Sequence, residues 1–173
     1  TTRLVGSEMC IRDSDQMYTY LLDTYKENNL VYDTYNKTQL ESKLAYDGNY
    51  KAYFEFIADS LKRYSSQRDK QKGEAFVHGF TLAMASQCRF YRPISELDND
   101  GGYADIFLSP LCDIYKDMVD SYIIELKYCK TSTTDEQVKE LLKVASAQIT
   151  RYADSDIVRD AVKTTRLHKL VVM

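Results

Sequence analysis

Two short apolar segments with charged residues inside them constrain the fold of this chain most. Residues 101–108 and 122–128 are rich in β-branched and aromatic residues and are bounded by Gly, Asp or Pro, so we predict two strands. Because side chains alternate along a strand, Glu125 and Lys127 point to the same face, and Asp105 joins them if the strands are neighbours. Burying such charges unpaired costs several kcal/mol, and a divalent cation would offset that cost.

The remaining periodic segments predict helices around these strands. We expect helices at residues 15–27, 38–46, 50–64 and 71–86, a helix that starts within 131–136 and runs to about residue 153, a short helix at 156–162, and further strands at 89–94 and 167–173. Together these elements predict an α/β fold, in which a small mixed sheet of about four strands is flanked by helices on both faces and preceded by a helical segment.

Two polar residues in these outer elements need an interpretation. In the helix that ends near residue 153, Gln148 lies within the apolar stripe, where a buried amide needs a partner. The members of that stripe are Val138, Leu141, Leu142, Ala145, Ile149 and Tyr152. We interpret His168, in the last strand, as a surface residue.

Composition sets the class of protein. With 173 residues, 44% of them hydrophobic, the chain is long enough for one domain with a core and an appended helical segment. We expect a cytoplasmic protein without a membrane partner, because the chain has neither a bilayer-spanning apolar run nor a signal peptide. The four cysteines lack C-x-x-C spacing, which favours buried thiols over a zinc site. The net charge of −3 argues against a general nucleic-acid coating protein, although it does not exclude an acidic metal site with a basic rim.

Three segments are expected along the chain. Residues 1–14 show no periodicity and in part resemble translated sequencing-adapter sequence, so we expect them to be non-native or disordered. Residues 15–70 form a helical segment that ends in the polar stretch 65–72, and residues 71–173 form the domain that carries the charged strands. The last strand ends without flanking polar residues, so we expect truncation at the C-terminus as well as at the N-terminus.

Four motifs in a fixed order resemble the PD-(D/E)XK nuclease superfamily. They are Gly-Glu-Ala-Phe-Val-His-Gly-Phe at 73–80, Ala-Asp at 104–105, Glu-Leu-Lys at 125–127 and Ala-Gln-Ile-Thr-Arg-Tyr at 147–152, with Ala104 where the family often has Pro. The resemblance covers roughly residues 48–173. It implies a restriction-endonuclease-like core, and it points to a branch in which this domain follows an AAA-ATPase-like module, with residues 15–70 as the connector from that module.

The resemblance also implies roles for individual residues. Asp105 and Glu125 would bind Mg²⁺ or Mn²⁺, which hard oxygen ligands favour. Lys127 would orient or help deprotonate the attacking water. Glu74 would contribute to the metal site or its surroundings, and Gln148 would lie near the catalytic residues.

Other interpretations of these residues stay open from the sequence. Glu125 and Lys127 also fit an exposed ion pair on an edge strand. Glu74 and His78, four residues apart, also fit a solvated helix flank, although His78 could contact substrate. Their order, Glu-x-x-x-His, does not fit the His-Glu-x-x-His pattern of a zinc protease.

The resemblance implies a metal-dependent nuclease that hydrolyses phosphodiester bonds, with DNA as the expected nucleic-acid partner. The alternative is a catalytically weak, nuclease-like domain that binds or regulates beside the AAA-ATPase-like module. Whether two copies pair as a homodimer stays open.

Overall fold

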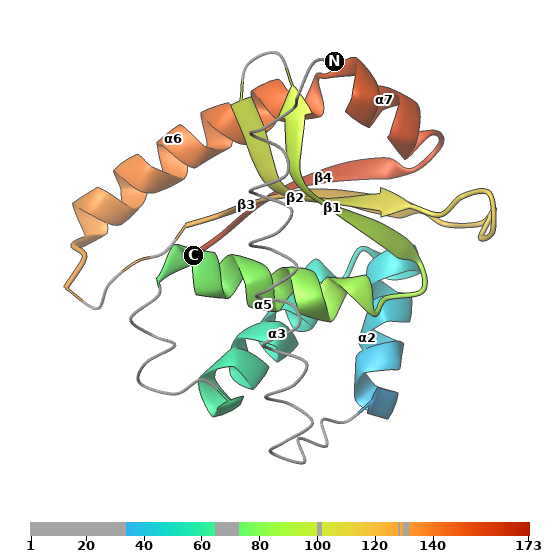
Figure 1. Cartoon of the computed structure of the whole chain (residues 1–173), viewed down its shortest axis with the longest axis horizontal. Helices are drawn as coiled ribbons and strands as arrows, with labels where there is room; N and C mark the ends of the chain where they lie inside the picture. The colour runs from blue at the N-terminus through green and yellow to red at the C-terminus, as the bar shows by residue number, and fades with distance from the viewer. Residues whose placement is uncertain (1–33, 65–72, 100–101, 128, 130–131) are drawn as a thin grey trace, which may run out of the picture.

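Four strands form one mixed sheet with helices on both of its faces (Figure 1). The computed structural model describes residues 34–64, 73–99, 102–127, 129 and 132–173, so the expected segment 1–14 and the expected helix 15–27 lie outside the described residues. The described helices are α2 (Thr34–Asp47), α3 (Tyr50–Tyr64), α5 (Glu74–Ser86), α6 (Asp135–Ala153) and α7 (Asp156–Val162). The strands are β1 (Tyr91–Asn99), β2 (Gly102–Pro110), β3 (Asp120–Leu126) and β4 (Arg166–Val172). The predicted α/β fold with a small mixed sheet is confirmed.

The sheet has the strand order β1-β2-β3-β4, so β3 is an interior strand. Strand β2 is antiparallel to both β1 and β3, whereas β3 and β4 are parallel. All seven residues of β3 are buried, as expected for a strand covered on both faces. Glu125 therefore does not belong to an exposed pair on an edge strand, and that interpretation is wrong.

The pairing between β2 and β3 is much shorter than the strands themselves. Strands β1 and β2 pair from Tyr91–Pro110 to Asn99–Gly102, but β2 and β3 pair only at Ile106–Ile124, Phe107–Ile123 and Leu108–Tyr122. The ladder between β2 and β3 therefore stops one residue before Asp105 on one strand and one residue before Glu125 on the other. We call this point the fork between β2 and β3.

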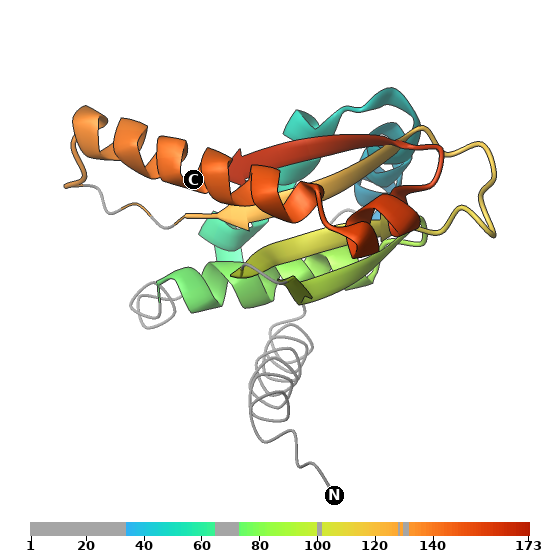
Figure 2. The same ribbon diagram turned by 90° about the horizontal axis from the view of Figure 1, so that it is seen from above.

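Each face of the sheet has its own core. On one face α2, α3 and α5 pack over the side chains of Ile106, Ile124 and Leu126. On the other face α6 and α7 pack over Phe107 and Ile123. Figures 1 and 2 show these two helical layers on opposite sides of the strands.

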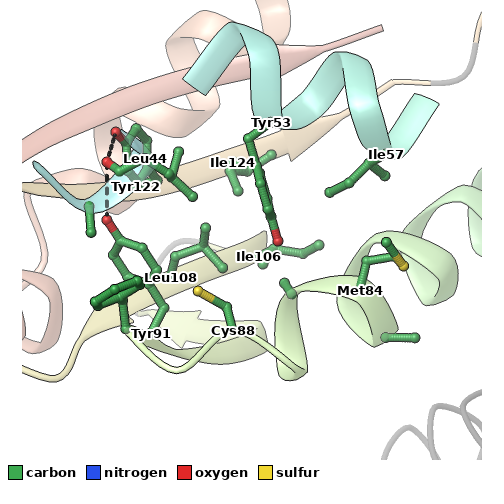
Figure 3. Packing of buried hydrophobic residues seen from close by; sticks show 14 of the residues in the cluster. Leu44, Tyr53, Ile57, Met84, Cys88, Tyr91, Ile106, Leu108, Tyr122 and Ile124 are labelled. Carbon is green, nitrogen blue, oxygen red and sulfur yellow. Dashed lines mark hydrogen bonds between the residues drawn. The ribbon is translucent and has the colours of Figure 1, made fainter. Parts of the chain in front are cut away.

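Helices α2 and α3 belong to the larger of these two cores. Leu44 from α2 and Tyr53 and Ile57 from α3 are each at most 4% exposed. Figure 3 shows Tyr53 reaching from α3 towards Ile106, and the hydroxyls of Tyr91 and Tyr122 pointing at the carbonyl of Leu44. Tyr122 donates to that carbonyl at 2.7 Å. The helices that we expected as a connector are thus packed on the sheet that carries the charged residues.

A buried aspartate joins the start of β3 to β4. Asp120 is fully buried, and its Oδ1 accepts hydrogen bonds from Arg166 Nε at 2.9 Å and His168 Nε2 at 2.7 Å. The His168 ring also stacks on Tyr122, with the ring centroids 4.9 Å apart. The prediction that His168 is a surface residue is therefore wrong, because its ring contacts the buried Asp120. The sequence did not reveal this contact, since Asp120 lies 48 residues earlier in the chain.

Gly48 makes the close approach of the α2–α3 turn to this aspartate possible. Its φ of 65° lies in the left-handed region, and a Cβ there would lie 3.3 Å from Asp120 Oδ2. A larger residue would be strained at this position and would press on the carboxylate.

The sequence predicted the ends of some helices and strands correctly and those of others incorrectly. Helix α6 starts with the expected capping residues, because the side chains of Thr134 and Gln137 each bond the backbone of the other. Strand β1 runs past its predicted end at residue 94 to Asn99, since Pro93 is tolerated on an edge strand. Leu142, expected in the buried stripe of α6, is 43% exposed.

Candidate active site

Asp105, Glu125 and Lys127 meet at the fork. Asp105 and Glu125 have the same strand parity as Phe107 and Ile123, which places both carboxylates on the face that α6 covers. Lys127 Nζ lies 2.9 Å from Glu125 Oε1. The cluster predicted from the sequence is therefore formed by two neighbouring strands.

The carboxylate of Asp105 bridges the fork. Its Oδ2 accepts a hydrogen bond of 2.6 Å from the backbone N–H of Leu126. The Leu126 side chain points into the opposite core, so only its backbone takes part in the site. Sequence reasoning did not assign this N–H, because every non-proline residue carries one and the contact depends on how two strands diverge.

Burial disfavours the charged form of the Glu125 carboxylate. The Glu125 side chain is only 3% exposed, and burial raises its pKa above the usual value. The charges of Asp105 and Glu74 raise that pKa further, while the hydrogen bond from Lys127 lowers it. Glu125 is thus a carboxylate whose ionised form depends on a nearby cation.

The lysine responds to the same carboxylates. Burial lowers the pKa of Lys127, but the hydrogen bond to Glu125 and the negative charges of Glu125, Asp105 and Glu74 outweigh it and raise the pKa. The ammonium stays protonated at neutral pH as a result. Lys127 is therefore a fixed positive charge beside two carboxylates.

Two oxygens near this face lack a hydrogen bond. Glu125 Oε2 and Gln148 Oε1 are both buried and have no hydrogen-bond partner within the described part of the chain. Gln148 lies on α6, the helix that packs on the face where Glu125 points. Unsatisfied buried oxygens are costly, and a divalent cation with its water molecules would satisfy such atoms. The donor set therefore fits a hard cation.

Glu74 lies on a helix, unlike the other two acids of the predicted site. It lies exposed in the first turn of α5, which covers the opposite face of the sheet. Among the residues that the structure describes, no three His, Cys, Asp or Glu side chains gather closely enough to hold a metal ion. The negative charge of Glu74 nevertheless contributes to the raised pKa of both Glu125 and Lys127.

His78 is half-buried and points into the protein. Its Nε2 lies 2.9 Å from the backbone carbonyl oxygen of Asp105 and 3.2 Å from Ser95 Oγ. The solvated-flank interpretation is wrong for His78, although it describes the exposed Glu74. Sequence reasoning missed Ser95, since a lone serine in a strand gives no signal of a distant partner.

Replacing Lys127 by methionine should destabilise the fold by about 2–3 kcal/mol at pH 8, somewhat less than for a wholly buried pair because Lys127 is partly exposed. Without the ammonium the pKa of Glu125 rises further. Its folded-state pKa then lies well above the unfolded value, so stability is fully present below about pH 4.3 and falls as pH rises through the folded-state pKa. Urea unfolding at pH 5 and pH 8 should therefore show a larger loss at pH 8.

Two further variants check this account. The double variant Glu125→Gln with Lys127→Met should regain most of the lost stability, because it removes the unpaired buried charge. Lys62→Met, on the exposed side of α3, should change stability by less than about 0.5 kcal/mol. A Lys127→Met loss that is equal at both pH values would contradict the assigned role of Glu125.

Comparison with protein families gives one result that covers this site. Residues 72–173, more than half of the chain, match the family described as the PD-(D/E)XK nuclease superfamily. Searches of curated proteins and of solved structures returned no significant match. No described helix is long and apolar enough to cross a membrane. The mixed sheet with helices on both faces is the expected restriction-endonuclease-like fold, and the chain belongs to the PD-(D/E)XK nuclease superfamily.

Proposed function

We propose that this protein is a metal-dependent nuclease that hydrolyses phosphodiester bonds of DNA. The observation that carries the proposal is the state of Glu125, which is buried, paired with Lys127 and left with one oxygen that has no hydrogen-bond partner in the described part of the chain. Such a buried oxygen costs stability unless something binds it, and a cation held by Asp105 and Glu125 would satisfy it.

Each residue of the cluster has a proposed task. Asp105 and Glu125 would hold Mg²⁺ or Mn²⁺, which supplies neutralisation of the phosphate charge. Lys127, a compact ammonium held by Glu125, would orient the attacking water and offset the charge that develops on the phosphate oxygens. The N–H of Leu126 orients the Asp105 carboxylate.

Two residues would act around this centre. The amide of Gln148, whose oxygen lacks a partner in the described residues, would receive a hydrogen bond from water or substrate. Glu74 would take part through its charge or through water in the outer shell of the cation.

The family match supports a nuclease, whereas the substrate, the metal and the roles of single residues are proposals. DNA is proposed as the substrate from the resemblance, and RNA of the same sequence is the direct comparison. The AAA-ATPase-like module, with residues 15–70 as its connector, and pairing into a homodimer are further proposals of the same kind.

Thermal unfolding with Mn²⁺ tests the cation site without a substrate. At a metal concentration ten times the Kd, mass action should stabilise the protein by about 1.4 kcal/mol, which corresponds to roughly 3–6 °C in Tm. The Asp105→Asn variant should lose this shift. The exposed Asp59→Asn variant on α3 should keep it.

The nuclease proposal itself is tested by incubating linear DNA and RNA with Mg²⁺ or Mn²⁺. Cleavage that stops with EDTA and in Asp105→Asn would support it. Metal-dependent stabilisation without cleavage of either nucleic acid would instead favour the alternative of a nuclease-like binding domain.

A further inference from the structure

The imidazole of His78 connects α5 to the backbone of Asp105. Its Nε2 lies 2.9 Å from the Asp105 carbonyl oxygen. A carbonyl oxygen can only accept, so Nε2 must carry the proton and donate. Ser95 Oγ, at 3.2 Å from the same nitrogen, is then a second and weaker acceptor.

The sheet holds Asp105 towards β1 but not towards β3, because β1 pairs with both of its neighbours, Ala104 and Ile106. The register between β2 and β3 ends at Ile106–Ile124, one residue before Asp105. Two hydrogen bonds outside the ladders also reach this residue: its carbonyl accepts from His78, and its carboxylate accepts from the Leu126 N–H. The bond to the carbonyl comes from His78 on α5, and the bond to the carboxylate comes from Leu126 on the neighbouring strand β3.

His78 reaches Asp105 from the side away from the carboxylates. Helix α5 packs on the face that carries Ile106 and Ile124, whereas Asp105 and Glu125 have the parity of the opposite face. The imidazole therefore meets the backbone of Asp105 and not its carboxylate. This geometry differs from a substrate contact, which was one of the two interpretations of His78 that the sequence left open.

We propose that His78 is a positioning residue, which holds the Asp105 carboxylate against the Leu126 N–H through its hydrogen bond to the Asp105 carbonyl. The placement stands on the geometry alone, and only its importance for catalysis rests on the proposed nuclease function. Because the Nε2–H donor exists in both the protonated ring and one neutral tautomer, the placement does not require a charged histidine.

The test compares His78→Leu with His78→Gln. Leucine keeps apolar volume and removes the donor, whereas glutamine offers an Nε2–H at a similar distance from the backbone. Amide hydrogen exchange of Leu126 is the main measurement, and the amide of Ile123, within the β2–β3 ladder, is the internal reference.

In His78→Leu we expect Leu126 to exchange at least about tenfold faster while Ile123 keeps its wild-type rate. His78→Gln should restore Leu126 to within about threefold of wild type. Ser95→Ala, which removes only the weaker acceptor, should leave both amides unchanged. In wild type, the ¹⁵N shifts of the His78 ring should show a proton on Nε2.

Two results would overturn the inference. Wild-type exchange of Leu126 in His78→Leu would show that the imidazole does not hold the carboxylate in place. Equal acceleration of Leu126 and Ile123 would show general loosening of the fold instead of a local role.

Mn²⁺ affinity and cleavage separate this inference from the proposed function. If His78 positions Asp105 in an active site, His78→Leu should weaken Mn²⁺ binding by about tenfold and lower kcat, and His78→Gln should recover both. If wild type neither binds Mn²⁺ nor cuts DNA while Leu126 responds as described, the nuclease proposal fails and the positioning role stands.

Discussion

The Glu125→Gln variant is expected to cleave DNA about a thousandfold more slowly than wild type, equivalent to ~4 kcal/mol of transition-state stabilisation, while its unfolding changes little. Glutamine keeps the shape of the side chain and an oxygen that accepts from Lys127, so the packing survives. It removes the charge that would hold the cation. Stability should stay within about 1 kcal/mol, because burial already disfavours the charged form of Glu125.

The measurement is the initial rate of cleavage under saturating Mn²⁺, together with urea unfolding of the same samples. Glu55→Gln is the matched control, since its side chain is 63% exposed on α3, and it should retain wild-type activity. Activity of Glu125→Gln within threefold of wild type would remove Glu125 from the catalytic role. Loss of both activity and cooperative unfolding would show that the carboxylate is structural.

The second large effect is expected from a fragment limited to residues 72–173, the region of the family match. This fragment lacks α2 and α3, whose Leu44, Tyr53 and Ile57 are almost completely buried against the sheet. Burial of each such side chain contributes about 1.5–3 kcal/mol, so these three alone approach a typical total stability of about 5–15 kcal/mol. We expect the fragment to lack a cooperative unfolding transition and to aggregate through its uncovered face.

A fragment of residues 34–173 is the matched control for this experiment. It retains α2 and α3 and should give dispersed amide signals and a single thermal transition. If the 72–173 fragment unfolds cooperatively with stability close to that of the longer fragment, the two helices are an accessory layer. In that case the folded unit begins at α5.

The features that the sequence predicted well depend on neighbouring residues. Helix α6 has a capping box and an apolar stripe, so its start and end follow from local chemistry. The alternation that puts Glu125 and Lys127 on one face is equally local. The features that it missed depend on distant contacts. His168 contacts the carboxylate of Asp120, and His78 contacts the backbone carbonyl of Asp105. A single sequence gives no distance between such residues.

The short ladder between β2 and β3 divides the sheet into two parts of two strands each. Strands β1 and β2 form the part that carries Asp105, and β3 and β4 form the part that carries Glu125 and Lys127. Among the described residues, backbone pairing joins the two parts only from Ile106–Ile124 to Leu108–Tyr122, whereas helices α5 and α6 pack on strands of both parts. The separation of the two carboxylates is therefore set by the helices on both faces and by contacts at the fork such as the Asp105–Leu126 hydrogen bond, and not by the β2–β3 ladder itself.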